Sequence, residues 1–244
     1  MIRLTMKSLA VGAAFLLIGC NDSDNNLPAV PEKPSSVSVK VVHAVSDAPD
    51  VSISRSNGVV IPNLAFGAVA DPLVASPGSF ALAVDAKLPG NTVARVIPET
   101  TLDLAEATDY VVFAAGKAAD SSIEPIVVSF PQTAVSSGNV RLRVVHGAAS
   151  APTVDVHLTA PTAELSAGTV AATLEFTDAT GDVTVPAGDY RVRITPAGNL
   201  TTVVYDSGTV ALTSGSDLTI AALDSRFAGD SPVSLLALVQ GGNT

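Results

Sequence analysis

The chain has 244 residues, of which 47% are hydrophobic, and its 23 acidic and 13 basic side chains give a net charge of −10. Because contact with phosphate backbones needs a positive surface, this balance argues against nucleic acid as a partner. The chain has one cysteine, which excludes an intramolecular disulfide, so stability must come from burial of the abundant Val, Ile, Leu and Ala side chains.

The beginning of the chain has the layout of a secretory signal. Arg3 and Lys7 precede an apolar run from Leu9 to Gly19, and Cys20 follows that run directly. The run is shorter than the ~20 apolar residues that a membrane-spanning helix needs. We therefore expect residues 1–19 to be a cleaved signal peptide.

The sequence Leu17-Ile18-Gly19-Cys20 resembles the lipobox of bacterial lipoproteins. The resemblance implies that Cys20 becomes the lipidated N-terminus and that the membrane is a partner through this anchor; the alternative is an ordinary signal peptide that ends at a chance cysteine. Multiple acyl chains anchor a protein stably without a transmembrane helix. In Gram-negative lipoproteins an Asp directly after the cysteine resembles an inner-membrane retention signal, and Asn21 stands there instead. This favours the outer membrane of the cell envelope, on its periplasmic or surface face.

Residues 20–36 are predicted to be a flexible, lipidated tether. The segment is polar and then carries Pro28, Pro31 and Pro34. Polar side chains bury too little surface to order such a segment, and prolines favour extended backbone. The tether is expected to hold the folded part away from the membrane.

The remainder of the chain contains an internal duplication. Residues 39–53 (VKVVHAVSDAPDVSI) align without gaps with residues 142–156 (LRVVHGAASAPTVDV), and His43 and His146 occupy equivalent positions. Each repeat has about 100 residues, which is a common size for one domain. A cluster of Ser, Gly and Asn residues marks the boundary. The predicted domains are 37–136 and 138–241.

Both repeats show the period-two alternation of half-buried β-strands. In the first, Val37, Val39 and Val41 alternate with more polar neighbours, and Gly, Pro, Asn and Asp turns separate the short apolar runs. The fold predicted from this spacing is all-β, with two tandem antiparallel Greek-key (immunoglobulin-like) β-sandwich domains after the signal peptide. The predicted strands are 37–43, 50–54, 79–85, 92–97, 109–115 and 125–130, then 140–146, 153–158, 189–195, 201–206, 217–223 and 233–239.

The position of one tyrosine predicts a specific hydrogen bond. Tyr190 follows Pro186-Ala187-Gly188 and resembles a tyrosine corner, in which the hydroxyl ties a strand to its own arch. The equivalent Phe80 has no hydroxyl, so the first repeat cannot make that bond.

The repeated H-x-x-x-x-A-P-x-V segment, followed by Asp155 in the second copy, resembles a family of bacterial envelope domains of unassigned function that often occur in tandem behind lipoprotein signals. The resemblance implies a β-sandwich and no particular activity. The first repeat has Ser52 in place of Asp155, so a role that needs this carboxylate is in doubt there.

The histidines are the residues with the clearest chemical potential. A metal site needs three or four converging ligands, and the sequence has no H-x-H, H-E-x-x-H or cysteine pair. We therefore expect no metal and no cofactor. His43 and His146 are instead predicted to bond a backbone carbonyl, or the carboxylate that follows the Ala-Pro turn.

Catalytic motifs such as G-x-S-x-G and S-x-x-K are also missing from the sequence. The predicted function is therefore a non-enzymatic cell-envelope lipoprotein, a binding or structural module for an envelope protein or polysaccharide. The alternative is a periplasmic or surface hydrolase, or a metal-dependent enzyme, that uses His146, Asp155 and His157. Lack of Trp argues against an aromatic sugar platform. The candidate binding turns are 45–50 and 148–153, with candidate residues His43, Asp47, Asp50, His146 and Asp155.

Overall fold

The computed structural model describes residues 35–56, 58–226 and 232–240. The predicted signal peptide, the anchor Cys20 and the tether as far as residue 34 lie outside the described residues. Within the described part, no helix has the length and apolar character required to cross a membrane.

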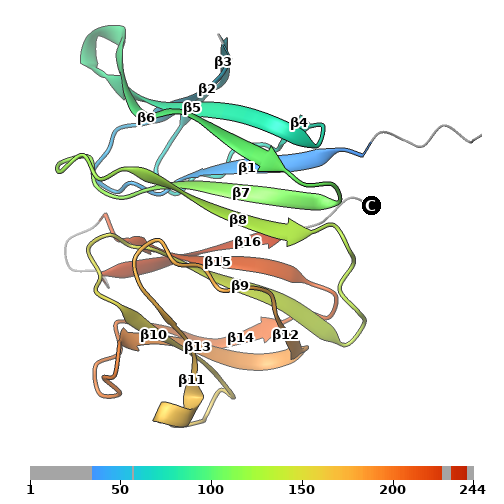
Figure 1. Ribbon diagram of the computed structural model, residues 1–244. Coiled ribbons are helices and arrows are strands. Elements are labelled where there is room, and N and C mark those ends of the chain that lie inside the picture. The colour runs from blue at the N-terminus through green and yellow to red at the C-terminus, as the bar shows by residue number, and fades with distance from the viewer. Residues whose placement is uncertain (1–34, 57, 227–231, 241–244) are drawn as a thin grey trace, which may run out of the picture. The chain divides into compact units, whose positions relative to one another are not determined.

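The first half of the chain forms two four-stranded sheets (Figure 1). Sheet A has the order β4-β1-β7-β8 and sheet B the order β3-β2-β5-β6. The pairing is antiparallel except between β1 and β7, which run parallel. The elements are β1 (Val37–His43), β2 (Val51–Arg55), β3 (Gly58–Leu64), β4 (Leu73–Ala75), β5 (Gly78–Leu88), η1 (Pro89–Asn91), β6 (Thr92–Leu104), β7 (Thr108–Ala115) and β8 (Glu124–Pro131).

The second half repeats this arrangement strand for strand. Sheet C has the order β12-β9-β15-β16 and sheet D the order β11-β10-β13-β14, again with one parallel pair, between β9 and β15. The elements are β9 (Asn139–Gly147), β10 (Val154–Thr159), η2 (Ala167–Thr169), β11 (Val170–Leu174), β12 (Val183–Pro186), β13 (Gly188–Pro196), β14 (Tyr205–Leu212), β15 (Asp217–Asp224) and β16 (Val233–Gln240).

The predicted all-β sandwich class is confirmed, and the structure adds strands that the sequence did not predict. Each sandwich has eight strands instead of six, because β3, β4, β11 and β12 were not expected. All four strands lie at sheet edges and have at most one buried side chain each, so they carry little of the apolar content that marks a half-buried strand. The predicted strand 201–206 is displaced, since β14 spans Tyr205–Leu212.

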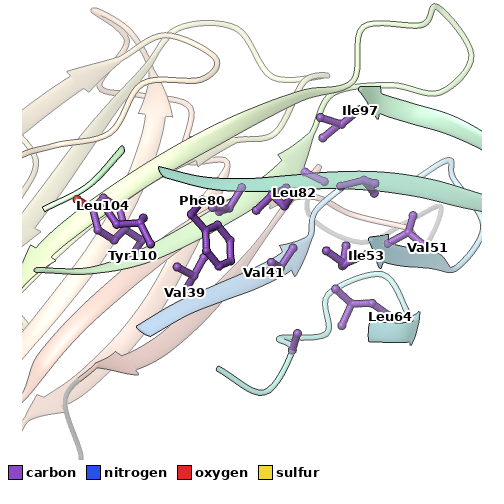
Figure 2. Packing of buried hydrophobic residues seen from close by; sticks show 14 of the residues in the cluster. Val39, Val41, Val51, Ile53, Leu64, Phe80, Leu82, Ile97, Leu104 and Tyr110 are labelled. Atoms are coloured by element: carbon purple, nitrogen blue, oxygen red, sulfur yellow. The ribbon is translucent and has the colours of Figure 1, made fainter. Parts of the chain in front are cut away.

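The alternating valines of β1 explain how the first sandwich closes. Val39 and Val41 are fully buried and point between sheets A and B, where they meet Phe80 and Leu82 of β5 (Figure 2). Full burial of one such side chain stabilises the fold by roughly 1.5–3 kcal/mol. The period of two in the sequence therefore places one face of β1 in the core.

The opposite faces of sheets A and C are also buried, in one shared apolar cluster. Val42, Phe113 and Ile126 of sheet A belong to it together with Ala221 and Leu223 of sheet C. A β-carbon added at Gly147 of β9 would lie 3.1 Å from Leu223 and 3.9 Å from Ile126, so small residues are needed there. The two repeats therefore share buried surface in addition to their separate cores.

Ion pairs lie at one end of this shared cluster. The Arg143 side chain, 1% exposed, reaches Asp217 with an Nη1 to Oδ1 distance of 2.5 Å and Asp182 with an Nε to Oδ1 distance of 2.6 Å. Its guanidinium also lies 5.1 Å from the centre of the Phe130 ring. Lys40 of the first repeat donates to the side-chain oxygen of Gln240 at 3.1 Å. The buried charges are thus paired, as burial of a charge requires.

Candidate functional site

The two repeated histidines hold the turns that follow them. The Nε2 atom of His43 lies 2.9 Å from the Pro49 carbonyl oxygen, and that of His146 lies 3.0 Å from the Pro152 carbonyl oxygen. Since a carbonyl can only accept, Nε2 carries the proton in both rings. Burial lowers the pKa of His43, which favours the neutral ring. The predicted bond from histidine to a backbone carbonyl is confirmed in both repeats.

The predicted carboxylates of the first turn also make structural contacts. Asp47 accepts hydrogen bonds from the backbone N–H groups of Ala118 and Ala119, at 2.9 and 3.0 Å. Burial raises the pKa of Asp47, but these two donors more than offset it and leave the pKa below its ordinary value. Asp50 accepts from the Asn63 side chain at 2.9 Å. Asp47 therefore joins the turn to the loop after β7, and Asp50 joins it to β3.

The structure brings the two predicted turns together around the end of β15. Arg226 donates to the carbonyl oxygens of Ser46 and Ala48, at 2.8 and 2.6 Å. Asp224 accepts from the backbone N–H of Ser150 at 3.0 Å, and its other oxygen lies 3.9 Å from the Lys117 ammonium. Sequence reasoning missed Arg226 and Asp224, because neither belongs to the repeated motif. Turns 45–50 and 148–153 are thus partly occupied by contacts within the chain.

The three residues of the alternative enzyme hypothesis do not form one site. Val154 and Val156 point into the core of the second sandwich, so Asp155 between them and His157 beyond them face the outer side of sheet D. His146 lies in sheet C with its ring edge against Phe176.

Asp155 and His157 are each hydrogen-bonded within the fold. Asp155 accepts from the Thr173 hydroxyl at 2.5 Å and from the Gly198 N–H at 2.8 Å. The ring nitrogens of His157 lie 3.0 and 3.2 Å from the hydroxyls of Thr169 and Thr195. Burial lowers the pKa of His157, and the nearby Asp155 offsets this only in part. Among the described residues, no cluster of three His, Cys, Asp or Glu side chains is placed to hold a metal ion.

A covering segment, residues 160–169, lies over this outer face of sheet D and includes η2 (Figure 1). Arg193 donates to the Ala163 carbonyl oxygen at 2.6 Å and to the Thr159 hydroxyl at 2.9 Å. Thr169, at the end of the segment, provides the hydroxyl that meets His157. The covering segment therefore buries a row of polar side chains that would otherwise face solvent.

The equivalent face of sheet B is open. Ser54 and Ser56 stand where the second repeat has His157 and Thr159, and Arg55 at the end of β2 pairs with Gly58 at the start of β3. A groove of about 430 Å³ lies there. Its lining residues are Ser54, Ser56, Gly58, Val59, Arg95 and Glu99.

Charged side chains are fixed beside the groove. Asp85 accepts from Arg95 Nε at 2.7 Å, from Arg95 Nη2 at 3.2 Å and from the Ser54 hydroxyl at 2.8 Å. The bond from Arg95 holds the pKa of Asp85 below its ordinary value, against the effect of burial. Sequence reasoning missed this groove, since isolated surface charges carry no motif; the change from His157 to Ser54 between repeats was the available signal.

The class that these features define is an all-β protein with two sandwiches of identical strand order. A family model described as a domain of unknown function, DUF4397, matches residues 37–157, which cover the first sandwich, β9 and most of β10. Residues 37–157 are therefore similar to this family. No curated protein matches the chain.

Two solved structures are distantly similar. The Bacillus anthracis TIE protein is 9% identical, with a TM-score of 0.23, over 85% of this chain and 44% of that one, so this chain spans less than half of its length. A Bacteroides fragilis NCTC 9343 protein, described as a candidate cell adhesion protein, is 11% identical with a TM-score of 0.23, over 85% of this chain and 98% of that one. Likenesses at these scores carry no argument about function.

Proposed function

We propose that the protein is a non-enzymatic lipoprotein of the cell envelope, in which two β-sandwiches act as a binding or structural module for an envelope protein or polysaccharide. The lipid on Cys20 anchors it, with the outer membrane as the favoured location. The second sandwich is inferred to be a second copy of the domain that the family model matches in the first, because the two share one strand order and the histidine-turn bond.

The observation that carries the non-enzymatic part of the proposal is the engagement of the candidate catalytic groups. His146 bonds the Pro152 carbonyl oxygen, and Asp155 and His157 bond hydroxyl and backbone groups on another sheet. A general base needs to reach a substrate proton at hydrogen-bond distance, and a metal needs converging ligands. Side chains held apart in this way favour a structural role.

The anchor is tested by replacing Cys20 with serine. Cys20→Ser should remove the label in metabolic labelling with a fatty acid and should shift the protein from membrane to soluble fractions or leave it unprocessed. A variant that fractionates with membranes as the wild type does would contradict the anchor.

The non-enzymatic role is tested by elemental analysis of the purified protein with the His146→Ala and His157→Ala variants. We expect no stoichiometric metal in any of them. One equivalent of metal in the wild type, lost in either variant, would overturn the proposal in favour of a metal-dependent enzyme.

A further inference from the structure

The groove on sheet B owes its volume to small side chains at positions that are large in the second repeat. Ser54 and Ser56 line the groove where the second repeat has His157 and Thr159, and only two residues separate β2 from β3, whereas the covering segment separates β10 from β11. In sheet D the larger side chains and the covering segment fill this space with hydrogen bonds. The face of sheet B therefore has room for a molecule from outside the chain.

We propose that this groove binds a neutral, hydroxyl-rich ligand of the saccharide class, held between Arg95 and Glu99. This inference rests on the proposed binding function and names the ligand class for it. It is independent of the turns 45–50 and 148–153, which contacts within the chain partly occupy.

Charge and polarity narrow the ligand class. Arg95 and Glu99 line the groove, and Asp85 beside it pairs with Arg95, so the local charge is not positive and disfavours an anion. The hydroxyls of Ser54 and Ser56 line it, which disfavours an apolar ligand because their polar atoms would lose water without replacement. A neutral polar ligand satisfies both conditions.

The hydrogen-bonding groups of Arg95 and Glu99, which line the groove, fit two adjacent hydroxyls of a sugar ring. Asp85 engages Arg95 through Nε and Nη2, which leaves the Nη1 group as a donor, while the exposed Glu99 is an acceptor. Asp85 first and Glu99 to a smaller extent raise the pKa of Arg95, so the guanidinium stays charged beside the carboxylate. Adjacent sugar hydroxyls both donate and accept, so one ring can bridge the two side chains.

The expected affinity is low. Val59, 60% exposed at the rim, offers an aliphatic contact to a sugar ring, but the groove has no aromatic face among its lining residues. Saccharide binding without aromatic stacking is expected in the millimolar range of Kd. Such affinity suits repeated engagement of a polymer by many anchored copies better than capture of a free sugar.

The experiment is a titration followed by nuclear magnetic resonance of backbone amides, on the chain from residue 20 with Cys20→Ser. The probes are maltose, cellobiose and N,N′-diacetylchitobiose, with inorganic phosphate as the anionic comparison. At least one disaccharide should shift the amides of Ser54, Val59 and Arg95 in a saturable way, and phosphate should not. Saturable shifts elsewhere, or none at these amides, would overturn the proposal.

Two matched variants make the result specific. Glu99→Gln removes the acceptor charge on an exposed side chain and should weaken binding about tenfold. Glu106→Gln makes the same change on an exposed turn outside the groove and should leave binding unchanged. Equal affinities in wild type and Glu99→Gln would count against the assigned site, and amide spectra that match elsewhere show that both variants are folded.

A peptide probe separates the competing ligand class. A synthetic peptide with the sequence of residues 160–169, which covers the equivalent face of sheet D, should not compete with the disaccharide. If this peptide alone shifts the groove amides, the groove is a polypeptide site and the saccharide assignment is wrong. Failure of the groove proposal would leave the anchor test on Cys20 unaffected, so the two proposals can fail separately.

Discussion

The two sandwiches share a strand order but differ on their outer sheets. In sheet D, His157 and Arg193 lie beneath the covering segment and are fully or almost fully buried, whereas in sheet B Ser54 and Ser56 line an open groove. The apolar positions that build each core are retained in both repeats, with Val51 and Ile53 matching Val154 and Val156. This comparison indicates that the side chains facing the core determine the fold. Side chains on the outer face of the same strands can differ between the repeats and acquire a separate role.

The repeats also secure their arches with different tyrosines. In the second sandwich the Tyr190 hydroxyl donates to the Pro186 carbonyl oxygen at 2.9 Å, which confirms the predicted tyrosine corner. In the first sandwich Tyr110 of β7 accepts from the Ala105 N–H at 2.9 Å, and its counterpart in the second is Leu218. Each sandwich therefore has a hydrogen bond between a tyrosine hydroxyl and the backbone, but at connections between different pairs of strands. The fold does not dictate the position of this bond.

The largest expected effect concerns the equivalent residues Asp217 and Asp109. Asp217→Ala leaves the buried Arg143 with Asp182 as its remaining carboxylate partner and should lower the free energy of unfolding by about 3 kcal/mol. Asp109→Ala should cost about 1 kcal/mol, because Asp109 bonds the Ser38 N–H and the exposed Gln132 side chain. Chemical denaturation of both variants measures the difference. Equal losses would show that the two positions are energetically equivalent.

The histidine turns should respond more similarly. His43→Ala and His146→Ala each remove a partly buried hydrogen bond and should lower the free energy of unfolding by roughly 1–3 kcal/mol. Thermal melts at neutral pH measure this. If only one of the two variants lost stability, the two histidine turns would not be equivalent.

The His43 turn should also depend on pH. Burial lowers the pKa of His43 from its ordinary value of 6.5, so below that pH the unfolded chain binds a proton that the folded chain does not. The stability is therefore complete above about pH 6.5 and falls as the solution becomes more acidic. His43→Gln should flatten this fall between neutral and mildly acidic pH in denaturation experiments, with the remaining slope assigned to His157. An unchanged slope would contradict a neutral, buried His43.

The tyrosines should show a smaller difference. Tyr110→Phe leaves the Ala105 N–H without its partner and should cost about 1 kcal/mol, whereas Tyr190→Phe removes a more exposed bond and should cost about 0.5 kcal/mol. Because neither change alters the ring, core packing is held constant. Melting curves recorded in parallel test the order, and a larger loss for Tyr190→Phe would reverse it.

The smallest expected effect is on an ion pair of sheet D. Arg191 bonds Asp206 and, against the effect of burial, holds the pKa of that carboxyl at about 2. Arg191→Gln should return the pKa toward the ordinary value of 3.8 while changing the melting temperature little, since both side chains are 34% exposed. A pH titration of the Asp206 carboxyl resonance checks this. A pKa that stays near 2 would assign the effect to the Gly208 N–H instead.

Sequence patterns predicted the features that depend on local spacing. The alternation of Val37, Val39 and Val41 gave the core face of β1, and the repeated histidine before an Ala-Pro turn gave its hydrogen bond. Edge strands such as β3 could not be predicted, because most of their side chains are exposed and the few that pack on the core follow no period of two.

Contacts between residues distant in the sequence lay beyond sequence reasoning for a different reason. The groove beside Arg95 and the bonds of Arg226 to the first turn require sheet pairing and loop positions that no local pattern contains. The lipid anchor stays a prediction, since Cys20 lies outside the described residues.

The parallel pairing of β1 with β7 has a consequence for the order in which each repeat can fold. Val39 lies beside Tyr110, and Arg141 beside Asp217 in the second repeat, so each pair joins the first strand of its domain to the next-to-last one. Contacts of such long sequence separation slow folding, and all-β domains dominated by them fold in roughly milliseconds to seconds. A chain that emerges from its N-terminus cannot complete sheet A until β7 has arrived. Until then β1 lacks its paired strand along one edge, and this unpaired edge can associate with other chains.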